Sequence, residues 1–417
     1  MKIVIVADHA HVNGGQAKVS IESAKGLALL GHDVVYFAAV GPVDPGLAAA
    51  GVKAIVLDQP DVTSAQSLTR FGVQWLWNFA AARKLAEVLD ACDPRETIIH
   101  VHAWAKALSP SIGPVLKRTK VPRVFTMHEY YLACPNGGFY DYPVARPCLR
   151  RPMSLACIAH NCDSRNYMRK LMRVGRHELL KSGMLDSLSD VITISHLQRE
   201  ILQPYLPTGV RYHDIANPID VAPLGQKPQA PLGDFIFVGR ISAEKGAKIF
   251  AEAARRAGKQ AVFVGDGPAT DELKALYPEA RIVGWKSAAE VKQLMRAARA
   301  LVFPSVWYEG QPLTVLESLG LGTPVIVSDV CAGREAVKDG VNGLWFKSAD
   351  PDSLAQALHR LSDDDTARQM SRAAYDLYWA EPLTLERHLD ALVALYRAVL
   401  GEAPQPAARF DASRQIP

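Results

Sequence analysis

The amino-acid sequence predicts an α/β protein with two doubly wound domains, each made of a parallel β-sheet covered by helices on both faces. Short apolar runs rich in β-branched residues alternate with longer helix-like segments along most of the chain. The runs are continuously apolar, which is typical of strands that are buried on both faces of a parallel sheet. The length of 417 residues is more than one ordinary hydrophobic core holds, so two domains are expected.

The predicted strands fall into two groups. Those of the first half of the chain are the segments 2–7, 33–38, 53–57, 97–102, 123–128 and 191–195. Those of the second half are the segments 235–240, 261–265, 281–284, 300–305, 324–328 and 343–347. Ligands bind open parallel sheets at the carboxyl ends of the strands, so functional residues are expected just after these segments.

The alternation of strands and helices stops between residues 204 and 234, where six prolines accumulate, and this stretch is interpreted as a linker. The predicted domains are therefore 1–215 and 216–375. Residues 376–400 are predicted to form a last helix, broken at its proline, that returns to the first domain. The tail 401–417 is rich in Ala, Pro and Gln and is predicted to be disordered.

The composition excludes several classes of protein. A net charge of +4 is well below the basic excess of a nucleic-acid-binding protein, so no nucleic-acid partner is expected. No stretch approaches the roughly 18 apolar residues of a membrane span, and the apolar run before Asp8 is too short for a signal peptide. Six cysteines in 417 residues do not make a disulfide scaffold. The chain is therefore expected to be cytoplasmic.

Two candidate phosphate-binding turns follow strands of the second domain. In VGRISAEKG (238–246), Arg240 and Lys245 lie in a turn that leads into a helix, where free backbone N–H groups and two cations suit a diphosphate. An ordinary surface turn with solvated charges fits the same residues. In VGDGP (264–268) the glycines allow the close approach of a ligand, although a plain turn explains them equally well. Neither turn has the GxGxxG pattern of a dinucleotide site.

Two glutamates, eight positions apart, flank the start of a predicted helix in YEGQPLTVLESLG (308–320). Glu309 lies in the loop after strand 300–305, Pro312 is predicted to be the first helical residue, and Glu317 lies within the helix. An anion can bind the free N–H groups between them, while each carboxylate reaches hydroxyls on one side. The spacing therefore suits a sugar–diphosphate–ribose chain. The alternative is a cap-region glutamate followed by a half-buried glutamate with a basic partner.

These motifs, in this order, resemble those of the retaining GT-B glycosyltransferases of family 4. The resemblance is strongest over residues 235–345, where GRISAEKG, VGDGP and YEGQPLTVLESLGLGTPVIVSD occur in turn. In the first domain it rests on VNGGQAKVS (12–20), TMHEYY (126–131) and ISHLQRE (194–200). It implies a GT-B fold, in which two Rossmann-like domains face each other across a cleft. It also implies glycosyl transfer with retention of the anomeric configuration and without a divalent metal.

The resemblance implies roles for individual residues as well. The catalytic set is Glu309 at the hydroxyls of the donor sugar, His128 beside the transferred sugar, and Arg240 and Lys245 on the diphosphate. The donor-binding set is Glu317 at the ribose, Gly310 and Gln311 near the sugar or phosphate, Gly14 and Gly15 in the loop of the first domain, and Gly239. Gln311 replaces the aromatic or small residue expected at its position, so the motif does not identify the donor sugar.

The sequence therefore predicts a retaining glycosyltransferase that moves a sugar from a nucleotide-diphosphate donor, with a UDP-sugar favoured, to a hydroxyl acceptor in polysaccharide or lipid-linked glycan synthesis. A nucleotide-sugar epimerase of GT-B fold is disfavoured because it would lack the glutamate pair combined with GRISAEKG. A non-catalytic nucleotide-sugar-binding protein is disfavoured because both glutamates and both cations are present. A dinucleotide oxidoreductase is disfavoured by the missing glycine pattern.

Four cysteines cluster in a loop-like region of the first domain, with His160 nearby, namely Cys134, Cys148, Cys157 and Cys162. Four thiolates can hold a structural zinc ion. The gaps between these cysteines are irregular and no CxxC pair exists, so reduced thiols are favoured over a zinc site. No other cofactor is expected.

Segment 165–183 carries six Lys or Arg residues. Its apolar residues recur at helical spacing, and they are Met168, Leu171, Met172, Leu179 and Leu180. The favoured interpretation is an amphipathic helix that packs its apolar side on its own domain. The alternative is a basic face that contacts anionic lipid headgroups and brings the protein to the inner face of the cytoplasmic membrane, where a lipid-linked acceptor would lie.

Aromatic residues of the first domain allow two interpretations. His100, His102 and Trp104 lie at the end of strand 97–102, where they either border an acceptor cleft or are buried structural residues. Three further aromatic residues are assigned to a core helix rather than to a sugar-binding platform, namely Trp75, Trp77 and Phe79.

Overall fold

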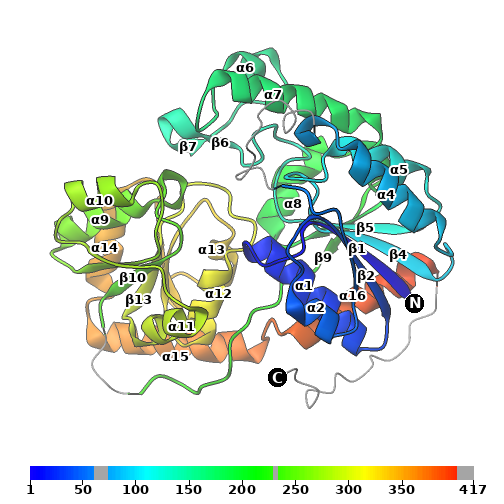
Figure 1. Ribbon diagram of the computed structural model, residues 1–417. Helices are drawn as coiled ribbons and strands as arrows, with labels where there is room; N and C mark the ends of the chain where they lie inside the picture. Colours follow the sequence, from blue (N-terminus) through cyan, green and yellow to red (C-terminus); the bar gives the residue numbers. More distant parts are fainter. Residues whose placement is uncertain (61–73, 229–232, 402–417) are drawn as a thin grey trace.

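The computed structural model describes residues 1–60, 74–228 and 233–401. Two domains lie side by side, and each contains a parallel sheet with helices packed on it (Figure 1). The N-terminal sheet has seven strands in the order β3-β2-β1-β4-β5-β8-β9, and the C-terminal sheet has six in the order β12-β11-β10-β13-β14-β15. In each sheet the first three strands are added toward one edge, and the next strand is placed on the other side of the first one. This confirms the predicted doubly wound arrangement.

All the predicted strands are present. Those of the N-terminal sheet are β1 (Lys2–His9), β2 (Asp33–Val40), β3 (Lys53–Val56), β4 (Thr97–Val101), β5 (Arg123–Met127), β8 (Asp190–Thr193) and β9 (Arg211–Asp214). Those of the C-terminal sheet are β10 (Phe235–Val238), β11 (Ala261–Val264), β12 (Arg281–Gly284), β13 (Ala300–Phe303), β14 (Val325–Ser328) and β15 (Gly343–Phe346). A short antiparallel hairpin, β6 (Tyr140–Asp141) and β7 (Arg146–Pro147), stands apart from both sheets.

The strand β9 lies where the sequence predicted a linker, so the start of that prediction is wrong. β9 is an edge strand, and its residues are exposed or half-buried, so it lacks the apolar run of a central strand. Polar contacts hold it instead. Arg211 donates two hydrogen bonds of 2.8 and 2.6 Å to the buried carboxylate of Asp190 on β8, and His213 lies 3.0 Å from the same carboxylate.

The helices connect and cover the strands. Those of the N-terminal domain are α1 (Gly15–Leu29), α2 (Pro45–Ala49), α4 (Phe79–Asp90), α5 (Gly113–Arg118), α6 (Leu155–Ala159), α7 (Tyr167–Glu178) and α8 (His196–Leu202). The later helices are α9 (Ala247–Ala257), α10 (Thr270–Leu276), α11 (Ala288–Ala297), α12 (Leu313–Gly320), α13 (Gly333–Ala336), α14 (Pro351–Arg360), α15 (Asp364–Ala380) and α16 (Leu385–Leu400). Within the described residues, none is long and apolar enough to cross a membrane.

The last helix, α16, packs on the N-terminal domain although the helix before it belongs to the C-terminal one. α15 runs along the base of the C-terminal domain, and α16 continues beneath the N-terminal sheet beside α1 (Figure 1). Leu389, Leu392 and Tyr396 of α16 are fully buried in a cluster with residues of β1 and β2. The chain therefore crosses between the domains twice, and the two crossing segments lie side by side, since Ile219 N donates a hydrogen bond of 2.7 Å to Leu383 O. The predicted disordered tail lies outside the described residues, apart from Gly401.

The helix α7 is oriented differently from the favoured prediction. Met168 is 67% exposed, and Leu171 and Met172 are also exposed, whereas Lys170 and Arg176 are buried. The buried cations have partners that a periodicity argument does not see. The guanidinium of Arg176 lies 4.5 Å from the centre of the Trp75 ring, and Lys170 is placed among cysteine thiols. The apolar side of α7 is thus turned to solvent.

The assignment of aromatic residues to a core helix is also wrong in part. Phe79 is the first residue of α4 and is 70% exposed, while Trp75 and Trp77 are half-buried. The buried residue of this segment is Asn78, whose side chain accepts a hydrogen bond from the backbone N–H of Ala81 and caps α4. The cap fixes where the helix begins and leaves Phe79 on its outer side.

Gly26 is expected to be required where α1 meets α16. A Cβ atom at this position would lie 2.4 Å from Cδ1 and 3.1 Å from Cδ2 of Leu389, which is fully buried. We expect Gly26→Ala to lower the free energy of unfolding by about 1–3 kcal/mol because of this overpacking, measured by urea denaturation.

Gly175→Ala in α7 is the matched control, because a Cβ there meets nothing within 4 Å. The higher helix propensity of alanine should make this variant equally or more stable, by up to about 1 kcal/mol. A Gly26→Ala protein as stable as the Gly175→Ala protein would contradict the packing argument.

Candidate active site

A cavity of about 330 Å³ lies between the two domains, at the carboxyl edges of both sheets. Its N-terminal wall includes the loop after β1, the start of α1 and residues that follow β4 and β5. Its C-terminal wall is formed by the turn before α9 and the loop between β13 and α12. The predicted site residues in its lining are Gly14, Gly15, His128, Lys245, Glu309, Gly310 and Gln311. The structure therefore brings both predicted walls together.

Specific contacts hold the two walls against each other. The carboxylate of Glu335, in the C-terminal domain, accepts hydrogen bonds from the backbone N–H groups of His196 (3.1 Å) and Leu197 (2.7 Å) at the start of α8. A carboxylate at this place satisfies free N–H groups and complements the helix dipole. The loop at the start of α1 also touches α12, since a Cβ on Gly15 would lie 3.4 Å from Leu313.

Lys245 and Glu309 form an ion pair in the C-terminal wall. Ser305 Oγ donates a further hydrogen bond of 3.0 Å to the same oxygen of Glu309, and the Lys245 ammonium lies 5.5 Å from the centre of the Trp307 ring. The side chain of Glu309 is only 12% exposed, so its charge is stabilised mainly by these neighbours. Lys245 is predicted to bind the diphosphate, and Glu309 is predicted to bind the donor sugar. In this structure the two side chains therefore pair with each other.

Gln311 has a structural partner that the sequence did not predict. Its Oε1 accepts a hydrogen bond of 2.7 Å from the backbone N–H of Asn217, which lies between the two domains. The loop before α12 is thereby tied to the segment that connects the domains. Pro312 occupies the N-cap of α12 rather than its first turn, so the helix begins one residue later than predicted.

Three predicted residues are absent from the described lining of this cavity, namely Gly239, Arg240 and Glu317. Arg240 is exposed at the end of β10, and Gly239 precedes it. Glu317 is half-buried on α12, where burial raises the pKa of its carboxyl and the charges of Lys18 and Lys292 oppose that shift. The structure therefore does not bring these three residues into the wall of this cavity.

The turn at 264–268 supports the turn of Arg240 through direct backbone packing. Gly265 has a positive φ of 135°, and a Cβ there would lie 2.0 Å from the carbonyl oxygen of Gly239. Backbone hydrogen bonds join the same turns, from Gly239 N to Val264 O (3.0 Å) and from Ile241 N to Asp266 O (3.0 Å). The glycine at 265 is therefore explained by the approach of the protein's own backbone, as the plain-turn alternative proposed.

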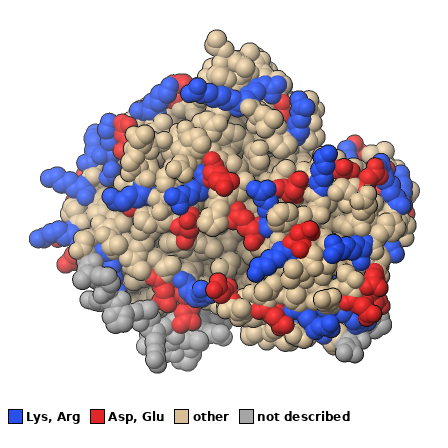
Figure 2. Space-filling view, turned by 180° about the vertical axis from the view of Figure 1, so that it is seen from behind, with Lys and Arg blue, Asp and Glu red and all other residues tan. Residues whose placement is uncertain are grey.

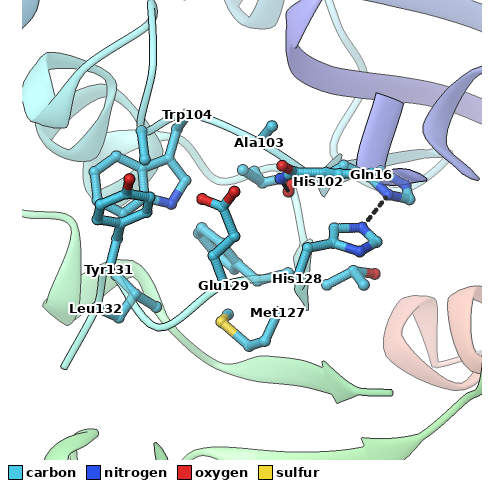
Figure 3. A pocket seen from close by; sticks show the side chains of 13 residues that line it. Gln16, His102, Ala103, Trp104, Met127, His128, Glu129, Tyr131 and Leu132 are labelled. Carbon is cyan, nitrogen blue, oxygen red and sulfur yellow. Dashed lines mark hydrogen bonds between the residues drawn. The ribbon is translucent and has the colours of Figure 1, made fainter. Parts of the chain in front are cut away.

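Three histidines form a connected row that starts at the cavity with His128. His128 Nε2 lies 3.2 Å from His102 Nδ1 (Figure 3), and the centre of the His102 ring is 3.9 Å from that of the His100 ring. His100 in turn contacts the hydroxyls of Tyr396 (2.5 Å) on α16 and Thr126 (2.7 Å). His100 is fully buried and structural, whereas His102 lies next to His128 and orients it. Trp104, also buried, lines a smaller adjoining cavity.

Burial keeps these histidines neutral. It lowers the pKa of His128 to about 3, and it lowers the pKa values of His100 and His102 well below the ordinary value, with neighbouring histidines adding to the effect. A fourth histidine, His388 on α16, is buried beside Ser23 and has a pKa of about 4 for the same main reason. His128 therefore acts near neutral pH as a hydrogen-bonding group without charge.

Sequence analysis missed Asp8, Lys106 and Glu129. The buried carboxylate of Asp8 accepts hydrogen bonds of 2.8–2.9 Å from the backbone N–H groups of Lys106, Ala107 and Leu108, which fixes the loop after β4. Lys106 Nζ lies 3.5 Å from Glu129 Oε1, and both residues line the cavity. Glu129 could have been found as a site residue because it follows the predicted His128 in the sequence. Nothing in the local sequence pointed to Lys106.

The cysteine cluster shows no metal-binding geometry. Among residues 1–60, 74–228 and 233–401, no three His, Cys, Asp or Glu side chains are arranged to hold a metal ion. The ammonium of Lys170 lies 3.4 Å from the sulfur of Cys157, and His160 contacts the carboxylate of Asp141 at 2.6 Å. Each cysteine described is a free thiol, and the zinc alternative stays a prediction.

Comparison with known proteins identifies the family. A model described as "Glycosyl transferase 4-like domain" matches residues 14–207, and one described as "Glycosyl transferases group 1" matches residues 233–364. The chain belongs to the group 1 glycosyltransferases. The matched regions of this glycosyltransferase contain all the residues predicted for catalysis and donor binding.

Curated relatives match parts of the chain. The UDP-Gal:alpha-D-GlcNAc-diphosphoundecaprenol alpha-1,3-galactosyltransferase of Escherichia coli is 31% identical over 184 residues, which cover 40% of this chain and 47% of the relative. The lipopolysaccharide 1,6-galactosyltransferase of Salmonella typhimurium is 29% identical over 214 residues, which cover 46% of this chain and 56% of the relative. The chain thus spans about half the length of these relatives.

Solved structures match nearly the whole chain. A glycosyltransferase from Rickettsia africae has a TM-score of 0.67 and 17% identity, with 96% of this chain and 99% of that chain covered. HepE from Anabaena, solved in complex with UDP-glucose, has a TM-score of 0.64 and 15% identity, with 95% and 100% covered. The fold of the group 1 glycosyltransferase described here is GT-B, as predicted.

The buried histidines are expected to make this glycosyltransferase unstable in mild acid. Their folded-state pKa values lie below the unfolded value of about 6.5, so the unfolded state binds more protons as the pH falls below that value. Each such histidine should lower the free energy of unfolding by about 1.4 kcal/mol between pH 7.5 and 5.5. Urea denaturation at the two pH values measures the sum.

His388→Gln removes one of these groups and keeps a hydrogen-bonding side chain. The difference in unfolding free energy between pH 7.5 and 5.5 should shrink by about one histidine's share in this variant. An unchanged difference would mean that His388 is not held neutral in the folded protein.

Proposed function

We propose that this protein is a retaining glycosyltransferase that moves a sugar from a UDP-sugar to a hydroxyl group of a glycan or lipid-linked acceptor. The Lys245–Glu309 pair in the interdomain cavity carries the proposal, because it places a cation and a carboxylate in one wall of a site that both domains close. A diphosphate needs the cation, and sugar hydroxyls need the carboxylate.

The relatives support a UDP-sugar and a lipid-linked acceptor. The name of the Escherichia coli relative gives UDP-galactose as its donor and a diphosphoundecaprenol-linked sugar as its acceptor. HepE of the same fold was solved with UDP-glucose. The name of the Salmonella typhimurium relative gives lipopolysaccharide and the transfer of galactose. We extend the shared features, a UDP-sugar and an acceptor in surface-glycan synthesis, to this chain.

Each predicted residue then has a defined task. Lys245 and Arg240 stabilise the negative charge that develops on the leaving diphosphate, with the free N–H groups at the start of α12. Glu309 accepts hydrogen bonds from the donor sugar, and Glu317 accepts them from the ribose. Neutral His128 forms a hydrogen bond with the transferred sugar. The two cations supply the positive charge that the leaving group needs, so the proposal includes no metal ion.

Retention is proposed to follow from attack on the face that the diphosphate leaves. The bond between the anomeric carbon and the phosphate oxygen breaks, and a bond forms from the acceptor oxygen to the same carbon. The proton of the acceptor hydroxyl passes to the departing phosphate oxygen, so no protein base is required. Such a step relies on positioning and on electrostatic stabilisation, which the two facing walls supply.

Donor binding is expected to raise the melting temperature of the protein. At a ligand concentration of about 100 times Kd the folded state gains about 2.7 kcal/mol, which corresponds to several degrees. Among UDP-, GDP-, ADP- and dTDP-sugars, a UDP-sugar should give the largest shift in differential scanning fluorimetry. Lys245→Ala and Arg240→Ala should reduce this shift because they remove charge from the diphosphate.

Lys248→Ala is the matched control, since Lys248 lies in the same segment but forms an ion pair with Glu272 on the far side of the turn. This variant should keep the full shift. Release of free sugar and UDP from the donor should accompany binding in wild type, which a non-catalytic binding protein would not produce. A folded wild-type protein that no nucleotide sugar stabilises would overturn the proposed function.

We further propose that the surface formed by α6 and α7 contacts a membrane that contains anionic lipids. Exposed apolar side chains gather there, namely Val144, Leu149, Leu155, Tyr167, Met168, Leu171 and Met172. Arg146, Arg151 and Arg165 are exposed beside them in the sequence. Seen from behind, Lys and Arg side chains form a row along the upper part of the molecule, below a protrusion covered by uncharged side chains (Figure 2). Apolar insertion combined with nearby cations suits an anionic bilayer surface.

The protein is expected to sediment with vesicles of phosphatidylglycerol and phosphatidylcholine at low salt, and much less with phosphatidylcholine alone. Replacing both Leu155 and Met168 with Ser should reduce the bound fraction several-fold because apolar insertion is lost. Leu276→Ser, at an exposed leucine on α10 of the other domain, is the control. Equal sedimentation of the double variant and wild type would exclude this surface as the contact.

A further inference from the structure

The N-terminal wall of the cavity contains two carboxylates with different surroundings. Asp8 is 2% exposed, and both of its oxygens accept backbone hydrogen bonds, from Lys106 (2.8 Å), Ala107 (2.8 Å) and Leu108 (2.9 Å). Three short hydrogen bonds from a rigid loop occupy this carboxylate. Asp8 therefore holds the wall in shape and is not available to a ligand.

Glu129 is accessible and incompletely paired. Its side chain is 31% exposed, and the ion pair with Lys106 spans 3.5 Å, longer than the roughly 2.7–2.9 Å of a charge-assisted hydrogen bond. Burial raises the pKa of Glu129, and the nearby Lys106 charge opposes the shift. Figure 3 shows its carboxylate pointing away from Met127, toward the space between Trp104 and Gln16. A partly desolvated carboxylate with one long ion pair is stabilised by any further hydrogen-bond donor that reaches it.

Lys106 and Glu129 also lie in the cavity that contains the proposed donor site. They line the same cavity as His128, Lys245 and Glu309, and they belong to the N-terminal wall. The proposed donor ligands Lys245 and Glu309 belong to the opposite wall. Lys106 and Glu129 therefore have no role in the proposed binding of the donor.

We propose that Glu129 and Lys106 form the acceptor subsite and that this subsite takes an uncharged sugar through two adjacent hydroxyls. One hydroxyl donates to the Glu129 carboxylate, and its neighbour accepts from the Lys106 ammonium. A hydroxyl can donate and accept, so adjacent hydroxyls match an anion and a cation held 3.5 Å apart. A phosphate group at this position would be repelled by Glu129 and would compete with it for Lys106. This inference rests on the proposed function.

The adjoining cavity limits what the acceptor carries beside these hydroxyls. It has a volume of about 30 Å³ and is lined by Gln16, Trp104, Glu129 and Tyr131, among others. A space of this size holds one water-sized group and no more. The sugar ring itself therefore stays in the larger cavity, with room for a small substituent beyond Glu129.

The test compares transfer with hydrolysis of the UDP-sugar that stabilises wild type. The acceptor probes are octyl glucoside, octyl galactoside and octyl N-acetylglucosaminide, each beside the corresponding sugar 1-phosphate. Wild type should glycosylate at least one octyl glycoside, and a sugar 1-phosphate that is used as well should depend on Glu129 and Lys106 in the same way. Glu129→Gln and Lys106→Met should each raise the KM for the octyl glycoside at least about tenfold, because a hydrogen bond to a charged group is lost. The ratio of transfer to hydrolysis should fall accordingly.

Glu178→Gln is the matched control, because Glu178 is an exposed glutamate of α7 paired with Lys181 at the surface. Its KM and its ratio of transfer to hydrolysis should equal those of wild type. Unchanged KM values in both Glu129→Gln and Lys106→Met, or donor hydrolysis without transfer to any octyl glycoside, would overturn the subsite. Absence of donor hydrolysis and of a melting shift in wild type would instead overturn the proposed function.

Discussion

The whole site depends on one constraint, namely that the carboxyl edges of two separate sheets face each other and stay close. The Glu335 carboxylate, seated on the first N–H groups of α8, is the contact that meets this constraint most directly. Gln311, hydrogen-bonded to Asn217, fixes the loop before α12 against the connecting segment. The chain's return through α16, whose first turn contacts the connecting segment at Ala216, adds a second covalent link between the domains. Without these contacts Lys245 and His128 would belong to two surfaces and not to one cavity.

The two walls of the cavity are built by different kinds of contact. In the N-terminal wall, the Asp8 carboxylate accepts hydrogen bonds from the loop after β4, and His102 Nδ1 contacts His128. The charged side chains of this wall are Asp8, Lys106 and Glu129. In the C-terminal wall, glycine-rich turns pack on each other and present charged side chains. Walls held by such contacts can position the substrates. Positioning is a large part of what a transfer with a diphosphate leaving group needs.

Much of this arrangement could be predicted because it rests on local patterns. Buried parallel strands require continuous apolar runs, so residues 235–240 and 324–328 can be recognised as strands from the sequence. The remainder depends on contacts between distant residues. β9 is held by the carboxylate of Asp190 rather than by apolar burial, and α7 buries Arg176 because an aromatic ring from another segment covers it. Glu129 is likewise defined by Lys106, 23 positions earlier in the chain. No periodicity encodes such partners.

The pairing of Lys245 with Glu309 has a consequence for turnover under the proposed function. The protein carries its own counterion, so an arriving diphosphate exchanges one partner of the lysine for another and does not meet a bare charge. The net electrostatic gain is the difference between two ion pairs, which moderates affinity for the nucleotide. When the sugar has left, Glu309 regains access to the lysine and competes with the product for it. The residue that orients the donor is then also the one that helps to expel the spent nucleotide.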